Sequence, residues 1–164
     1  MKKLMVLCLC LISVNIYAHD FIWGVNLQKF ITENGKPYRR NELQNINHII
    51  LSYKYATFER NYMFINNSLA GVQDMYGTFT DIDEAFEVFN MLYSRLDKIY
   101  NFVDIDEKKE QNEMRMTIRY EFGNDKISLV LVYDKNKSSI NIFLSYFSPL
   151  FLKDTEDRLR NLIN

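Results

Sequence analysis

The stretch that decides the fold reads DIDEAFEVFNMLYSRLDKIY and runs from Asp81 to Tyr100. Asp81 with an acidic residue three positions later is typical of a helix start, where acidic side chains also complement the helix dipole. Apolar residues then recur every three or four positions over about five turns, which predicts one long amphipathic helix. These residues are Ile82, Ala85, Phe86, Phe89, Leu92, Tyr93, Leu96, Ile99 and Tyr100.

Downstream of this helix the pattern changes to the period of strands. Apolar residues alternate strictly with polar ones from Met114 to Phe122, so we expect a strand with one buried face. Residues 127–133 and 139–147, separated by turn residues, complete a three-stranded meander. The segment 104–112 is densely charged and is predicted to be a loop, and residues 154–163 are predicted to form a terminal helix after Pro149 ends the last strand.

Upstream of the helix a similar order of elements is expected. Asn26 is a good N-cap residue, apolar residues follow it at helical spacing, and Gly35 and Pro37 are stop signals, so we expect a short helix between them. Strands are predicted over 48–58, 59–65 and 69–79. Adjacent Asn66 and Asn67 tolerate positive φ and suit a tight hairpin between the last two strands.

The order of elements predicts an α+β fold. A helix and three strands are followed by a helix and three strands, which suggests a duplicated helix-plus-three-strand unit. Antiparallel hairpins need cover on one face, and the amphipathic helices supply it. We therefore expect a two-layer domain in which an antiparallel sheet of about six strands is packed by helices. Because no linker interrupts the chain, residues 19–164 are expected to form a single domain.

The N-terminus has the pattern of a cleavable signal peptide. Lys2 and Lys3 precede an apolar run from Leu4 to Val14, and Ala18 places a small residue at the cleavage edge. We expect residues 1–18 to be removed and the product to be periplasmic or secreted, from a bacterium. An uncleaved anchor is one alternative, but the run is too short to span a bilayer. Lipid attachment at Cys8 or Cys10 is another, but each cysteine follows a bulky Leu where lipoprotein signals place a small residue. No later stretch is long and apolar enough, so no transmembrane segment is expected in the mature chain.

The net charge and the positions of the cysteines exclude several classes of function. The chain has 164 residues and a formal net charge of −1, and loss of Lys2 and Lys3 would leave −3. No basic surplus remains for nucleic acid or for an anionic membrane. Both cysteines lie in the expected signal, so the mature chain would have no thiol for catalysis, metal binding or a disulfide.

Several residues near the expected N-terminus resemble a motif of small exported bacterial proteins. The residues are Phe21-Ile22-Trp23-Gly24, Asn26, Leu27, Phe30 and Gly35-Lys36-Pro37. With the later elements, residues 21–147 resemble the fold shared by the β-lactamase inhibitor protein and the small outer-membrane assembly lipoproteins of the SmpA/OmlA type. That resemblance implies a role in binding other proteins. Asn26 replaces the usual Ser or Thr, and the lipoprotein attachment site and the inhibitor's disulfide cysteines are missing.

Residues for catalysis or for metal binding are scarce. The mature chain holds only His19 and His48, which leaves as an alternative a small secreted metal-binding protein or enzyme, with copper on an N-terminal His19 and on His48. The acidic residues 81–84 are interpreted as a helix cap and residues 104–107 as a solvated loop, rather than as acid/base groups or a calcium loop. Motifs for zinc, phosphate loops, dinucleotides and nucleophile elbows are absent. We expect no cofactor and no enzymatic activity.

Aromatic residues are the remaining signal. The chain has 12 Phe, 11 Tyr and 1 Trp, and Tyr and Arg are favoured at binding surfaces. Drift in an AT-rich genome and ordinary core packing are the alternative explanation. The sequence favours an exported, non-catalytic binding domain with an unidentified protein partner in the cell envelope. The candidate binding residues are Tyr53, Tyr55 and Tyr62, with Tyr76, Tyr133 and Tyr146 as further tyrosines, and Arg115 and Arg119 on the exposed side of their strand.

Overall fold

The computed structural model describes residues 21–43, 47–100, 102–109, 115–122, 127–135 and 137–163, with side chains over 21–43, 47–100, 127–135 and 137–158. The expected signal peptide, residues 1–18, and His19 lie outside this part. The described helices are α2 (Leu27–Asn34), α3 (Ile82–Ile99) and α4 (Pro149–Ile163). The described strands are β1 (Arg39–Leu43), β2 (His48–Lys54), β3 (Glu59–Ile65), β4 (Ser68–Phe79), β5 (Phe102–Lys109), β6 (Arg115–Phe122), β7 (Ile127–Asp134) and β8 (Ser139–Phe147).

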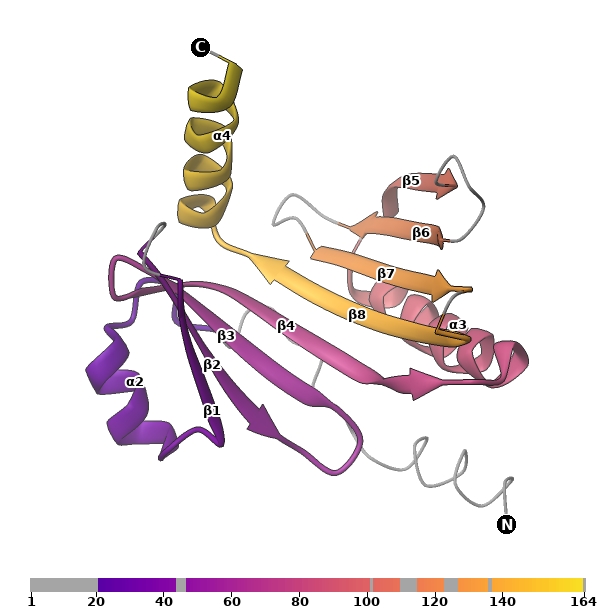
Figure 1. The fold of residues 1–164 in the computed structure, drawn as a ribbon, viewed down its shortest axis with the longest axis horizontal. Helices are drawn as coiled ribbons and strands as arrows, with labels where there is room; N and C mark the ends of the chain where they lie inside the picture. The colour runs from indigo at the N-terminus through magenta and orange to yellow at the C-terminus, as the bar shows by residue number, and fades with distance from the viewer. Residues whose placement is uncertain are drawn as a thin grey trace.

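All the described strands form one antiparallel sheet in the order β1-β2-β3-β4-β8-β7-β6-β5. Each half is a four-stranded meander that follows a helix, and the last strands of the two halves, β4 and β8, pair at the centre (Figure 1). The α+β class with an antiparallel sheet is confirmed. The repeated unit is a helix and four strands rather than a helix and three.

The two strands that the sequence does not reveal lie at the edges of the sheet. The prediction of a loop over 104–112 is wrong up to Lys109, because β5 pairs with β6 along this segment. β1 pairs with β2 and is exposed along its whole length. Edge strands carry charged side chains, so neither segment shows the apolar alternation of an inner strand. The sheet therefore has eight described strands instead of about six.

The helix boundaries follow from capping. The Asn26 side chain accepts a hydrogen bond from the Gln28 N–H (2.9 Å), and Gly35 ends α2 at a φ of 80°. Asp81 caps α3 as predicted. α4 begins at Pro149 instead of residue 154, because the Ser148 hydroxyl accepts from the Phe151 N–H (3.2 Å) and proline is favoured in the first helical turn.

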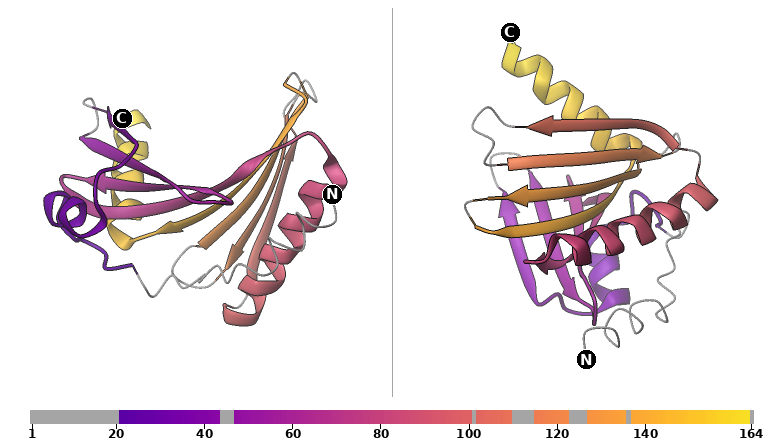
Figure 2. Two further views of the ribbon diagram at one scale, coloured as in Figure 1. Left: turned by 90° about the horizontal axis from the view of Figure 1, so that it is seen from below. Right: turned by 90° about the vertical axis from the view of Figure 1, so that its right-hand side faces the viewer.

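The apolar core lies between one face of the sheet and the helices α2 and α3. Figure 2 shows the sheet bent between its two halves, with both helices on the outer side of the bend. The Trp23-Gly24 segment joins this layer, since the Gly24 N–H donates to the Leu69 carbonyl (2.9 Å) and the Leu69 N–H to the Val25 carbonyl (3.0 Å). Within the described residues, no helix has the length and apolar character to cross a membrane. The largest fully buried side chains include Phe64, Phe89, Leu92, Leu129 and Tyr146.

Candidate functional site

The sheet face opposite α2 and α3, here called the open face, carries a line of polar side chains across five adjacent strands. In the strand register each residue of this line pairs with the next, from β2 through β3, β4 and β8 to β7. We call it the polar row. Its members are Ser52, Asn61, Gln73, Ser145 and Ser128. The three serines are buried, whereas Asn61 and Gln73 are half-buried.

Hydrogen bonds order the polar row. The Ser52 hydroxyl donates to Asn61 Oδ1 (2.6 Å), and Gln73 Nε2 donates to the Ser145 hydroxyl (3.2 Å). The first bond uses the amide oxygen of Asn61, and the second uses the amide nitrogen of Gln73. Within the described part of the chain, Asn61 Nδ2 and Gln73 Oε1 make no hydrogen bond, so the row offers a donor on β3 and an acceptor on β4 to a ligand.

Apolar side chains line the polar row, and charges lie at its ends. Met63 lies on one side, and Met75, Phe143 and Val130 form a row on the other, all of them half-buried. The centre of the described open face therefore holds no charged side chain. The charges that bound it are Arg39, Lys54 and Glu59 toward β1, and Asp134 and Lys137 at the turn between β7 and β8.

The backbone register extends these rows into β6. Arg119 pairs with Val130, which itself pairs with Phe143, so Arg119 occupies a position in the row of Met75. Arg115 pairs with Asp134 at the strand end. The side chains of both arginines lie outside the described part. The register is consistent with their predicted place on the exposed side of the strand.

The structure does not bring the three predicted tyrosines together on one exposed surface. Tyr62 is only 7% exposed, because it packs beneath α2 with its ring 4.5 Å from that of Phe30, and its burial raises its pKa to about 12. Tyr53 is half-buried on the same face, and its hydroxyl donates to the Gly35 carbonyl (2.7 Å). Tyr62 is thus a core residue, and its selection as a binding residue is corrected. Tyr55 is 48% exposed and stacks on Phe58.

The tyrosines predicted to bind a partner lie mainly on the strand face that packs against the helices. In β2 the aromatic and aliphatic set, Ile49, Leu51 and Tyr53, faces the helices, whereas Ser52 lies on the open face. Tyr76 and Tyr146 are likewise buried in the core, and Tyr133 packs against it. Alternation along β2 places Ser52 on the face opposite Leu51 and Tyr53, but only the strand register shows that Ser52 lies beside Asn61 and Gln73.

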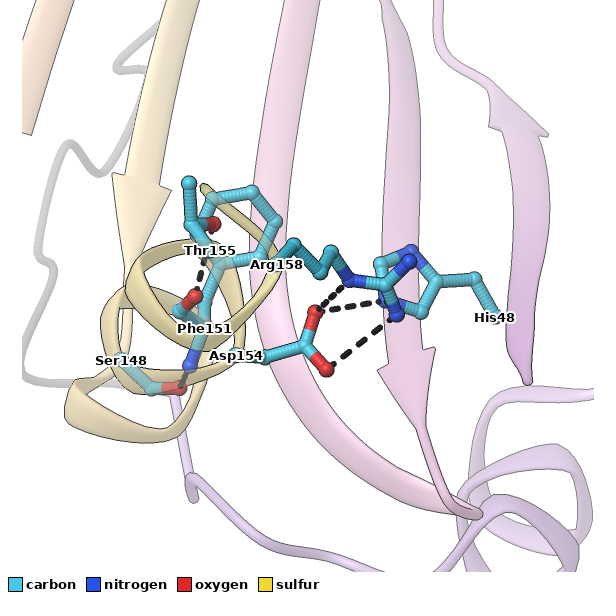
Figure 3. A network of polar contacts seen from close by, with 6 residues as sticks. All are labelled: His48, Ser148, Phe151, Asp154, Thr155 and Arg158. Atoms are coloured by element: carbon cyan, nitrogen blue, oxygen red, sulfur yellow. Dashed lines mark hydrogen bonds and ion pairs between the residues drawn. The ribbon is translucent and has the colours of Figure 1, made fainter. Parts of the chain in front are cut away.

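One end of the open face is closed by α4. The Phe151 ring stacks on Phe147 (centroids 4.5 Å apart), and it lies 3.6 Å from the position of a Cβ on Gly71. One turn further along α4, Asp154 approaches His48 on β2 (Figure 3). Figure 1 shows α4 standing at this end of the sheet. In the polar row beside it, Asn61 and Gln73 are the half-buried members, while the three serines are buried.

His48 is the described member of the possible copper pair. Its Nε2 lies 3.2 Å from Asp154 Oδ2 and 3.3 Å from Arg158 Nη2 (Figure 3). A guanidinium beside this nitrogen repels a metal cation, so the structure does not favour His48 as a ligand. The side chains described here include no group of three or more His, Cys, Asp or Glu suited to a metal ion.

A small pocket lies next to His48, where the turns before β2 and after β3 approach each other. Its volume is about 270 Å³, and three asparagines with positive φ shape it. No polar side chain buried within it points to a particular ligand. It is lined by Glu42, Leu43, Asn47, His48, Ile49, Asn66 and Asn67.

No protein-family model matches the chain, and no curated protein and no solved structure is significantly similar to it.

Proposed function

We propose that this chain is an exported, non-catalytic binding domain that holds a protein partner in the cell envelope on its open face. The observation that carries the proposal is the polar row with its apolar borders. Asn61 and Gln73, the half-buried members of the row, supply hydrogen-bonding groups at fixed positions, and Met63, Met75 and Phe143 supply apolar surface around them.

The distribution of charge supports a protein as the partner. Interfaces between proteins are depleted of charge at their centre, enriched in Met and aromatic residues there, and polar at the rim. The open face has an uncharged centre, and Arg39, Lys54 and Glu59 lie at its margin. The hydrogen bonds within the polar row hold its side chains in place before binding, which lowers the entropy lost on association.

The proposed location rests on the sequence of the first 18 residues. A positive start, a short apolar run and Ala18 favour export into the periplasm or the medium. A product with no free cysteine suits an oxidising compartment, because it has no thiol to misoxidise. An envelope partner follows from this location.

The proposal is tested by site-specific photo-crosslinking in cells of the source organism. A photoreactive phenylalanine analogue replaces Met75 on the open face, and in a matched control it replaces Glu87, an exposed position on α3. We expect a discrete adduct with one protein from position 75 and none from position 87. Mass spectrometry of the adduct then identifies the partner.

Substitutions then test whether the open face carries the affinity. N61R and M75R introduce charge at its centre and are expected to abolish co-purification of the partner, whereas E87R leaves it unchanged. Circular dichroism confirms that each variant is folded. Retention of the partner by both N61R and M75R, or adducts from position 87 alone, would contradict the proposal.

A further inference from the structure

The edge strand β1 combines an accessible backbone with an unusual arrangement of charge. All five of its residues are exposed, and it pairs with β2 on one side only. Tyr38 (47% exposed) precedes the strand and Leu43 (44% exposed) is its last residue, and both are among the large hydrophobic side chains left exposed in the described part. An edge of this kind is a template for a further strand.

The charges on β1 match a second copy of the same strand. Its sequence, RRNEL, has Arg40 and Glu42 on either side of Asn41. In an antiparallel pair of two such strands centred on Asn41, Arg40 of each copy lies opposite Glu42 of the other. Opposite charges directly across a strand pair are favourable, and like charges are unfavourable.

The same charges disfavour the neighbouring registers. In an antiparallel pair, two residues opposite each other both direct their N–H and C=O groups toward the partner strand, or both direct them away from it. The register of two identical strands can therefore shift only by two residues at a time. Its centre therefore moves from Asn41 to Arg40 or to Glu42. A register centred on Arg40 places the two copies of Arg40 opposite each other. A register centred on Glu42 places the two copies of Glu42 opposite each other.

Pairing at Asn41 leaves no unmatched charge. Arg39 is already held within its own chain, because its Nη2 lies 2.7 Å from Glu59 Oε1. Its partner across the interface is Leu43, which can pack on the aliphatic part of the arginine side chain. Arg40 and Glu42 contact each other within one copy (2.6 Å) and are both nearly half exposed, so they can exchange partners at little cost.

We propose that β1 pairs with β1 of a second copy of this chain, in an antiparallel register centred on Asn41. The dimer has a two-fold axis normal to the sheet at this residue, so both open faces lie on the same side of one continuous sheet. A five-residue strand contact is small for a protein interface. The association is therefore weak and depends on concentration, and it stands independently of the partner proposed for the open face.

Charge reversal provides the first test, by sedimentation equilibrium of the purified exported chain over a wide concentration range. R40E and E42R each place like charges opposite one another twice per dimer, and we expect each to raise the dissociation constant about tenfold or more. An equimolar mixture of the two variants restores opposite charges in the mixed dimer. The double variant R40E/E42R restores opposite charges between two identical copies, so its dimer should form as readily as that of the unchanged chain. It also provides a test if a single variant is unstable.

A disulfide provides the second test, since the two copies of Asn41 lie close together on the axis. With C8A and C10A removing the natural cysteines, N41C carries the only thiol in the chain. Directly opposed strand residues are near enough for a disulfide, so mild oxidation should yield a covalent dimer. S94C, exposed on α3, is the matched control and should stay monomeric.

The outcomes separate cleanly. A concentration-dependent dimer, lost in each single variant, regained in the mixture and trapped by N41C, supports the proposal. A monomer at every concentration overturns it. A dimer that is unaffected by R40E and E42R, or that S94C traps as readily as N41C, shows another interface and overturns it as well.

Discussion

Arg60 and Asp74 lie opposite each other on β3 and β4 and form a bidentate ion pair within the core-facing side of the sheet. Arg60 Nε and Nη2 donate to the two carboxylate oxygens at 2.6 and 2.7 Å, and Asp74 is fully buried. The guanidinium also lies over the rings of Phe21 and Phe58, at 5.4 and 5.2 Å. Burial alone would lower the pKa of Arg60, but the hydrogen bonds and charge of Asp74 raise it, so Arg60 stays charged.

Removal of one partner should be costly. D74N leaves the Arg60 charge in a largely desolvated site without its counter-charge, and we expect the free energy of unfolding to fall by about 3 kcal/mol. Urea denaturation followed by circular dichroism measures the change. S94A, on the exposed side of α3, is the control and should alter stability by less than about 0.5 kcal/mol.

The double variant R60M/D74L distinguishes the charge from the packing. Met is close to Arg in volume, and Leu has the same branching as Asp, so the double variant removes both charges while filling the site. Such apolar replacements of a buried ion pair are often neutral or stabilising. We expect R60M/D74L to be clearly more stable than D74N. Equal loss of stability in both would show that the ion pair has no special role.

The ion pair between Arg60 and Asp74 could not be predicted from the sequence, although the strands that carry it could. The strands β3 and β4 and the turn at Asn66 and Asn67 were predictable, because alternation and positive φ leave local signals. The pairing of Arg60 with Asp74 depends on the register of the whole hairpin, which shifts between Met63 and Phe64. A local pattern contains no such information.

The polar row could not be predicted from the sequence for a related reason. Alternation identifies two faces of a strand, and apolar residues such as Leu51 and Phe64 mark the face toward the helices. Ser52 and Ser145, by contrast, have no distinctive pattern along the sequence, and they become a row only when β2, β3, β4 and β8 are laid side by side. β1 was missed because an edge strand needs no apolar face.

Tyr76 offers a prediction of increased stability. Its hydroxyl is buried and has no hydrogen-bond partner in the part of the chain that the structure describes, and burial raises its pKa. An unsatisfied buried hydroxyl destabilises the folded state, so Y76F should raise the free energy of unfolding by about 1 kcal/mol. Y53F is the matched control, because it deletes the hydrogen bond to the Gly35 carbonyl and should lower stability by a similar amount. A large loss of stability in Y76F would reveal a partner for this hydroxyl.

The docking of α4 should weaken in acid. The hydrogen bond from Arg158 holds the pKa of Asp154 below its usual value, and His48 acts in the same direction. A carboxyl whose pKa is lowered by folding adds stability above its unfolded pKa of about 4, and this stability is lost as the pH falls through the lower folded pKa. Hydrogen exchange of residues 149–158, corrected for intrinsic rates, should show less protection at pH 3 than at pH 6, relative to α3. D154N should remove this difference, and an unchanged pH dependence in D154N would contradict the assignment.

Gly71 allows α4 to pack closely on the sheet, because it has no side chain beneath Phe151. A Cβ at this position would lie 2.7 Å from Met63 Cε, the mobile end of a side chain, and 3.6 Å from Phe151 Cδ2. Because Met63 can move aside, G71A should change the free energy of unfolding by less than about 1 kcal/mol, whereas the branched side chain of G71V also meets Phe151 and should cost about 1 to 3 kcal/mol. The loss should be local: in G71V, hydrogen exchange should speed up in α4 while α3 keeps its protection. Equal loss of protection in both helices would mean that Gly71 supports the sheet as a whole rather than the contact with α4.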